Sequence, residues 1–327
     1  MNYDDIVGHK IEIESLQRAI KNDHVSHFYL FEGEKGIGKK TTAKVFAKHI
    51  LCKSKKYEGP CEVCSSCRKF ESGSHPDYLE ISPTNGMIRK NEIENLIKEI
   101  SFSPFESAKK VILIDDAEKM NKESQNALLK TLEEPPTYIN LILVSSNSKL
   151  LLNTILSRAE KIHFKSINVN DMVEYLIKRE NVPLERAKLI ADFSQGSIGR
   201  AFELIKSEEF IKLRDDVINL VDNCIFGREY MVFELSERFT KTKEIANDVL
   251  LILLLHLRDI YFYKFTQDDK LLINKDKLEF IKKHSILEFG KINDIIEKIY
   301  YAKESIDLNV NRELLIETLF FNIQEEY

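Results

Sequence analysis

Short apolar runs alternate with segments of helical periodicity along residues 27–165. Each run is rich in β-branched or aromatic side chains and is bounded by polar residues, as buried strands are. The candidate strands are residues 27–33, 78–82, 111–116, 140–146 and 161–164. Because strands separated by helices pair in parallel, this pattern predicts an α/β domain with a parallel five-stranded sheet.

Two helices in this region are predicted from their own sequences. Residues 40–51 repeat apolar side chains at helical spacing, which makes one stripe that faces a core. A second helix covers about residues 122–134 and stops before Pro135 and Pro136, which cannot continue it. Both helices follow candidate strands, so they fit the βαβ pattern.

The strand pattern ends after Lys165, and the remaining sequence reads as helix after helix. We therefore predict an α/β domain at residues 1–166, a small helical domain at 167–207 and a larger all-α domain at 208–327. The second boundary depends only on polar composition and on the point where the helical period resumes. Wide apolar faces in the last domain indicate a bundle core.

Composition limits the function classes. The net charge of −5 and the pI near 6.0 lack the basic excess of a protein that holds DNA alone, so a nucleic-acid role would be shared with partners. The first ten residues do not resemble a signal peptide, and the longest apolar run, residues 249–255, is too short to span a bilayer. We expect a cytoplasmic protein without a membrane partner.

A glycine-rich loop follows the first candidate strand and precedes the first long helix. Gly33, Gly38 and Lys39 match the Gly-x4-Gly-Lys pattern of a phosphate-binding loop, with Gly36 between them. The glycines let backbone N–H groups approach phosphate oxygens, and Lys39 would reach the outer phosphates of ATP. The alternative is a tight strand-to-helix turn without a ligand.

The next position departs from the pattern. A hydroxyl there would bind Mg²⁺, but Lys40 occupies the position and Thr41 lies one residue further along the helix. An ammonium could neutralise phosphate charge directly, so ATP binding could survive while Mg²⁺-assisted hydrolysis suffers.

Two carboxylates end the third candidate strand. Asp115 is placed to orient Mg²⁺ or its water, and Asp116 stands where related ATPases carry a glutamate that polarises the attacking water. Aspartate is one methylene shorter, and catalysis depends on placement to within about an ångström. Paired acids at a strand end are also common as solvated turn residues.

Several segments together resemble the clamp-loader subunits of bacterial DNA polymerase III. Residues 126–136 and 154–158 are similar to both the tau/gamma motor and the delta-prime kind of subunit. Residues 74–78, 87–89 and 93–97 are more similar to delta-prime. The resemblance is specific through about residue 205, and beyond it there is a general likeness to a helical collar domain.

The resemblance implies an AAA+ fold in which the small helical domain is a lid and the last domain a collar that contacts other subunits. It implies a complex with tau/gamma motor subunits and delta that places a sliding clamp on primed DNA. Within it, a delta-prime subunit is a largely non-hydrolysing stator. The alternatives are the ATP-hydrolysing motor of the same complex and, less compatible with the acidic balance, a zinc-ribbon nucleic-acid binder.

The resemblance also implies roles for individual residues. Arg158 corresponds to an arginine finger that acts on the ATP of a neighbouring motor, although it could instead cap a helix or pair with Glu160. Ser146 lies at a sensor position for the terminal phosphate, and Arg200 in a second sensor segment of the lid. Ordinary turn chemistry or an exposed arginine would also explain these two residues.

Four cysteines form a C-x8-C-x2-C-x2-C pattern between the first long helix and the second strand. Cys52, Cys61, Cys64 and Cys67 suit a closed tetrahedral Zn²⁺ site, which would be structural because no ligand position is left open. An iron–sulfur cluster or free thiols are the alternatives. Clamp-loader relatives carry a zinc module at this place, here residues 52–67. Cys224 is most simply a small buried residue.

Overall fold

The computed structural model describes residues 1–54, 58–227, 230–308 and 310–324. The chain forms two compact units, Met1–Asn181 with Gln195–Arg200, and Val182–Ser194 with Ala201–Tyr327. The predicted three-domain division stays a prediction. Residues 55–57 of the predicted cysteine module, and residues 228–229, 309 and 325–327 of the predicted last domain, lie outside the described residues.

The first unit contains a five-stranded sheet in which every pairing is parallel, in the order β2-β3-β4-β1-β5. The strands are β1 (Phe28–Glu32), β2 (Tyr78–Ile81), β3 (Lys110–Ile114), β4 (Ile139–Ser145) and β5 (Glu160–His163). The predicted sheet is confirmed. Strands β1, β3 and β4 are almost wholly buried, as strands covered on both faces must be.

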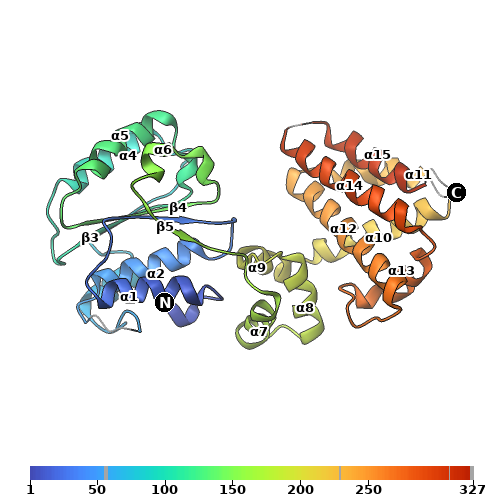
Figure 1. The fold of residues 1–327 in the computed structure, drawn as a ribbon, viewed down its shortest axis with the longest axis horizontal. Helices are drawn as coiled ribbons and strands as arrows, with labels where there is room; N and C mark the ends of the chain where they lie inside the picture. Colours follow the sequence, from blue (N-terminus) through green and yellow to red (C-terminus); the bar gives the residue numbers. More distant parts are fainter. Residues whose placement is uncertain (55–57, 228–229, 309, 325–327) are drawn as a thin grey trace. The chain divides into compact units, whose positions relative to one another are not determined.

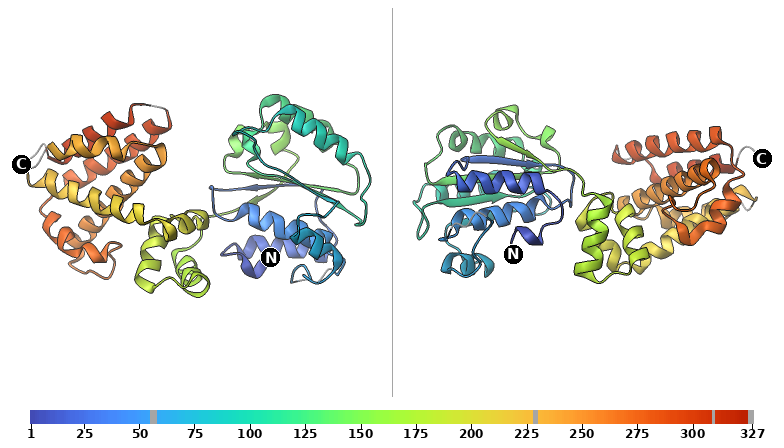
Figure 2. Two further views of the ribbon diagram at one scale, coloured as in Figure 1. Left: turned by 180° about the vertical axis from the view of Figure 1, so that it is seen from behind. Right: turned by 60° about the horizontal axis from the view of Figure 1, so that its bottom comes forward.

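Helices cover both faces of this sheet, α1 and α2 on one side and α4, α5 and α6 on the other (Figure 1). Figure 2 shows the same two-sided arrangement from behind. The helices are α1 (Lys10–Lys21), α2 (Lys39–Leu51), α3 (Ser65–Glu71), α4 (Lys90–Ile100), α5 (Lys122–Glu133), α6 (Asn153–Leu156) and α7 (Val169–Glu180). Short 3-10 helices are η1 (Tyr3–Asp5), η2 (Ala117–Lys119) and η3 (Ser148–Leu150).

The period-2 alternation of β1 explains the two cores. Tyr29 and Phe31 pack with residues of α1 and α2, such as Phe46, in one apolar cluster. Phe28 and Leu30 point to the opposite face and belong to the cluster formed with α4 and α5. The strand that leads into the glycine-rich loop is therefore clamped from both sides, which fixes the start of the loop.

The second unit is helical in its described residues. Its helices are α8 (Leu184–Phe193), α9 (Ile198–Lys206, shared with the first unit), α10 (Glu208–Ile225), α11 (Tyr230–Phe239), α12 (Lys243–Thr266), η4 (Lys275–Lys277), α13 (Leu278–His284), α14 (Phe289–Asp307) and α15 (Arg312–Gln324). Cys224 is buried in α10, as predicted. Among the described residues, no helix combines the length and apolar character needed to cross a bilayer.

Candidate nucleotide site and metal centre

The glycine-rich loop joins the end of β1 to the start of α2. Gly38 is the N-cap residue of α2, and its carbonyl accepts hydrogen bonds from the backbone N–H and the hydroxyl of Thr42, at 2.9 and 3.0 Å. Thr41 is half-buried in the first turn. At Gly33, a Cβ atom would lie 2.3 Å from the carbonyl oxygen of Phe164, so a side chain cannot be accommodated there.

The predicted second sensor segment packs directly against this loop. Gly199 N–H donates to the carbonyl of Gly36 at 2.9 Å, and a Cβ atom on Gly36 would lie 2.3 Å from Ser197 Oγ. Gly36 also has a positive φ of 78°, which favours glycine. The N–H of Arg200 donates to Ser197 Oγ at 3.2 Å. The fold therefore brings Arg200, as a member of this segment, to the rim of the loop.

Lys39 folds back onto the loop that precedes it. Its Nζ donates to the carbonyl oxygens of Gly33 and Glu34 at 2.6 and 2.5 Å, and the residue is 4% exposed. Burial lowers the pKa of this lysine, while the carboxylates of Glu118, Asp116 and Asp115 oppose the decrease. The ammonium predicted to reach the outer phosphates thus donates to carbonyls of the loop itself.

Lys40 forms ion pairs with carboxylates from two neighbouring strands. Its Nζ lies 2.8 Å from Asp115 Oδ2, just after β3, and 3.0 Å from Glu80 Oε1 on β2. Burial alone would lower the pKa of Lys40, but the hydrogen bonds to Asp115 and Glu80 raise it. The carboxylate predicted to orient Mg²⁺ therefore contacts an ammonium of the chain.

Asp116 and Glu118 add negative charge near Lys39. Burial, and then the neighbouring charges of Asp115 and Glu118, raise the pKa of Asp116, which has a left-handed φ of 44°. Glu118 Oε1 accepts from the N–H of Ser146 at 3.1 Å, which connects the Asp115 segment to the predicted first sensor. Glu118 belongs to no motif recognised in the sequence. Its position two residues after the paired acids was the available signal.

These residues do not fit a magnesium site of the usual P-loop kind. Mg²⁺ requires oxygen ligands in near-octahedral geometry, and a P-loop supplies one of them from a hydroxyl at the position of Lys40. Here that position carries a positive charge held against Asp115. The glycine geometry of a phosphate loop is present, but the metal half of the site is replaced by an ion pair.

Arg158 lies just beyond α6, at the surface of the first unit. Its Nη1 donates to the carbonyl of Thr154 at 2.7 Å, and its Nη2 pairs with Glu133 Oε1 of α5 at 2.9 Å. The side chain is 35% exposed, and that of Glu133 is 53% exposed. Arg158 therefore forms a local ion pair, as one alternative from the sequence proposed, but its partner is Glu133 and not Glu160.

The four cysteine sulfurs converge on one point. The Sγ atoms of Cys52, Cys61, Cys64 and Cys67 all lie within 4.8 Å of one another. Four sulfurs held about 2.3 Å from one tetrahedral ion would be about 3.8 Å apart, so the cluster fits a Zn²⁺-sized ion after slight contraction. The cluster could hold a metal ion, and no fifth ligand is required.

Backbone N–H groups donate hydrogen bonds to two of these sulfurs. The N–H of Cys61 donates to Cys52 Sγ, and that of Cys67 donates to Cys64 Sγ, both at 3.4 Å. Burial would raise the pKa of Cys64, but hydrogen bonds from the backbone of Cys67 and Lys53 lower it to about 6. Metals bind thiolates, so Cys64 is a donor of the required kind, whereas burial raises the pKa of Cys52 and of Cys67.

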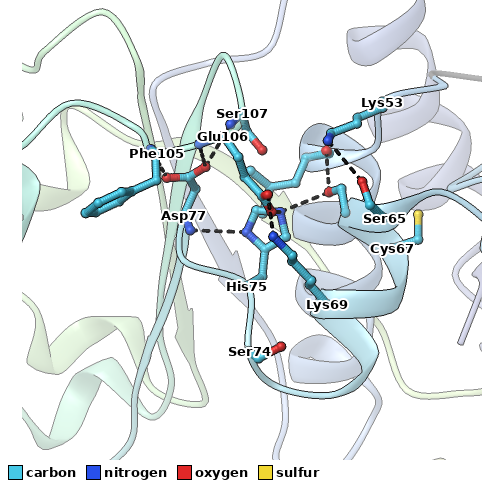
Figure 3. A network of polar contacts seen from close by, with 12 residues as sticks. Lys53, Ser65, Cys67, Lys69, Ser74, His75, Asp77, Phe105, Glu106 and Ser107 are labelled. Carbon is cyan, nitrogen blue, oxygen red and sulfur yellow. Dashed lines mark hydrogen bonds and ion pairs between the residues drawn. The ribbon is translucent and has the colours of Figure 1, made fainter.

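A buried polar network connects the cysteine module to the sheet (Figure 3). His75 Nε2 lies 2.9 Å from Ser66 Oγ of α3, and its Nδ1 accepts from the N–H of Asp77 at 3.1 Å. Asp77, which is fully buried, accepts the backbone N–H groups of Phe105 and of the next two residues, at 2.6–3.0 Å. The His-Pro-Asp segment noted from the sequence therefore fastens α3 and a surface loop to the start of β2.

Comparisons with known proteins agree with this architecture. Residues 8–168 match the family described as DNA polymerase III, delta subunit, and residues 208–325 match its C-terminal family. The chain is 33% identical to DNA polymerase III subunit delta' of Bacillus subtilis (strain 168) over 314 residues, 95% of this chain and 94% of that protein. It is also 33% identical to subunit tau of Escherichia coli (strain K12) over 205 residues, 61% of this chain and 32% of that protein.

A solved structure of a DNA polymerase III gamma subunit-related protein from Thermotoga maritima aligns over 96% of this chain and 98% of its own. The identity is 18% and the TM-score is 0.41.

The parallel sheet, the glycine-rich loop between β1 and α2, and the helical C-terminal region define an AAA+ protein. The chain belongs to the delta-prime family of DNA polymerase III clamp-loader subunits. It is thus a component of the DNA replication machinery, as its resemblance to that family predicted.

Proposed function

We propose that this chain is the stator of its clamp loader: it hydrolyses little or no ATP and presents Arg158 to the ATP of an adjacent tau/gamma motor subunit. The observation that supports this most directly is the Lys40 ammonium, 2.8 Å from Asp115, at the position of a metal-binding hydroxyl. Aspartate at position 116 adds to the argument, because its shorter side chain places a base less well.

Arg158 is suited to act on a neighbouring subunit. Among the residues that the structure describes, Glu133 is the carboxylate that pairs with Arg158, and both side chains reach solvent. Exposed ion pairs contribute at most about 1 kcal/mol, so exchanging Glu133 for a phosphate costs little. An arginine supplied in trans contributes roughly 10³ to 10⁵ in rate in phosphoryl transfer, which is sufficient reason for a subunit without its own turnover.

We further propose that the cysteine cluster holds a structural Zn²⁺, and that the chain acts in the cytoplasm with tau/gamma and delta. It would meet the sliding clamp and primed DNA through that complex, which agrees with a net charge of −5. In this proposal residues 1–166 are the AAA+ domain, 167–207 the lid and 208–327 the collar, and Ser146 and Arg200 are remnants of phosphate sensors.

A motor role is the second candidate, and Lys39 together with the glycine geometry of the loop favours it. The tau match of 33% identity over 205 residues is compatible with it as well. Mg²⁺-dependent ATP turnover by the isolated full chain decides between the two roles. Turnover at the rate of an isolated motor subunit would refute the stator proposal.

The arginine role is tested in a reconstituted clamp loader that contains Arg158→Ala. We expect normal assembly, measured by size-exclusion chromatography, and a fall in ATP turnover of roughly 10³-fold at the site that Arg158 serves. Glu133→Gln is the matched control, because it removes the partner of Arg158 but leaves the guanidinium, and its turnover should be unchanged. Normal turnover by the Arg158→Ala complex would exclude the finger role.

A further inference from the structure

Four charged side chains meet beside the phosphate loop, where the fold would otherwise place a divalent ion. Lys40 contacts Asp115 and Glu80, and Lys44, one helical turn further along α2, contacts the second oxygen of Glu80 at 2.9 Å. Lys40 Nζ also lies 3.3 Å from Ser82 Oγ. Two ammonium and two carboxylate groups balance each other, so the cluster needs no added cation.

The carboxylate of Glu80 is held in its charged form in the folded protein. Burial would raise the pKa of Glu80, but hydrogen bonds from Lys44, Lys40 and Tyr78 lower it. The carboxylates are therefore available as ligands only if a lysine withdraws. An arriving Mg²⁺ would have to displace the Lys40 ammonium from Asp115 and would then face its positive charge at close range.

We propose that Lys40 is a tethered replacement for Mg²⁺ that makes the loop reject magnesium complexes of nucleotides. The inference rests on the non-hydrolysing role proposed above and extends it from catalysis to ligand choice. The phosphate-binding geometry is retained at Gly36 and Gly38, with φ of 78° and 104°. A single side chain, and not the loss of the loop, therefore sets the specificity.

The test compares ATP binding to the full chain in MgCl2 and in EDTA, by calorimetry and by the shift in thermal unfolding. The wild type should show no gain in affinity from magnesium. Lys40→Thr places a hydroxyl at the metal position and frees Asp115, so its ATP affinity should rise at least about tenfold in magnesium relative to EDTA, the scale on which one interaction at a metal site matters. Each variant is compared with itself, so any general loss of stability cancels.

Two further variants serve as controls. Lys44→Thr removes an ammonium from the same cluster without freeing Asp115, and it should show no magnesium effect. Lys40→Met removes the charge but offers no oxygen, so its gain should be smaller than that of Lys40→Thr.

A wild-type chain that binds ATP more tightly with magnesium would overturn the proposal, as would a Lys40→Thr variant that gains nothing. Such results leave the stator role intact if Arg158→Ala still slows the complex. Conversely, if Arg158→Ala leaves ATP turnover by the complex unchanged, the magnesium test of Lys40 is still valid.

Discussion

The cysteine module and the phosphate loop were both recognised from short motifs, and they differ in how completely the fold uses them. In the module, all four predicted ligands converge within 4.8 Å, and backbone N–H groups point at their sulfurs. In the loop, the glycines keep their conformations, but Lys39 and Lys40 donate to groups of the chain itself. The first motif is complete, and the second is satisfied internally.

The difference shows what a motif requires from its surroundings. A closed tetrahedral site needs only its own ligands, so correct spacing is nearly sufficient. A phosphate loop needs a metal ligand, a second carboxylate and a sensor from separate elements. Lys40, which replaces the metal-binding hydroxyl, instead forms ion pairs with the carboxylate of Asp115 and with Glu80 of β2.

Removing the metal should produce the largest effect, and it tests the contrast between the cysteine module and the phosphate loop. Cys64→Ser removes one ligand, and zinc binding contributes roughly 10 to 16 kcal/mol in small modules. We expect elemental analysis to show one zinc per wild-type chain and a large loss in the variant. Hydrogen exchange in α3 should increase, because Cys64 is the N-cap residue of this helix and Cys67 lies within it.

The control for this experiment is Cys224→Ala, since Cys224 is 1% exposed in a helix of the other unit and should not affect the metal content. A metal-free wild-type chain with full amide protection in α3 would show that the module does not depend on metal.

Loss of the anchor between the loop at residues 105–107 and the sheet should have an intermediate effect. Asp77→Ala leaves three backbone N–H groups without their buried acceptor, so we expect about 3 kcal/mol less stability in urea unfolding at pH 7. Glu92→Ala, which removes a more exposed acceptor at the start of α4, should cost about 1 kcal/mol. Equal costs would refute the anchoring role of Asp77.

The same carboxylate should make stability depend on acid pH. Burial tends to raise the pKa of Asp77, but hydrogen bonds from Phe105, Glu106 and Ser107 lower it below the ordinary value. Its contribution is therefore complete above the unfolded pKa of about 3.9 and is lost as pH falls through the lower folded value. The stability gap between wild type and Asp77→Ala should narrow below about pH 4, and a constant gap would contradict this.

The smallest effect is expected for Gly36→Ala, which tests the contact between the phosphate loop and the 195–200 segment. Gly36→Ala must adopt a positive φ and displace Ser197 Oγ, which accepts the N–H of Arg200, so we expect a cost of about 2 kcal/mol. Gly73 is a matched control, because its φ of 70° is similar but nothing lies within 4 Å of an added Cβ. Gly73→Ala should cost about 1 kcal/mol. If both variants lose the same stability in urea, the contact between the loop and the 195–200 segment is not tight.

Local sequence was sufficient for the strands and the first helices. The helix predicted at residues 40–51 is Lys39–Leu51, and the one predicted at 122–134 is Lys122–Glu133. Both succeeded because apolar periodicity and proline act within a few residues. Local sequence could not predict the partner of Arg158. Glu160 is near in sequence, but the actual partner, Glu133, belongs to another helix.

The sequence by itself therefore determined the sheet, the glycine-rich loop, the four cysteines of the cluster and the departure at Lys40, because spacing and residue type carry that information. Only the tertiary structure decided that Lys40 pairs with Glu80 of β2 and with Asp115 just after β3, that Glu118 binds the Ser146 backbone, and that Asp77 anchors the loop at residues 105–107. Those contacts join segments distant in the chain, and their geometry is set by parallel strand register and by the cost of burying a charge without a partner.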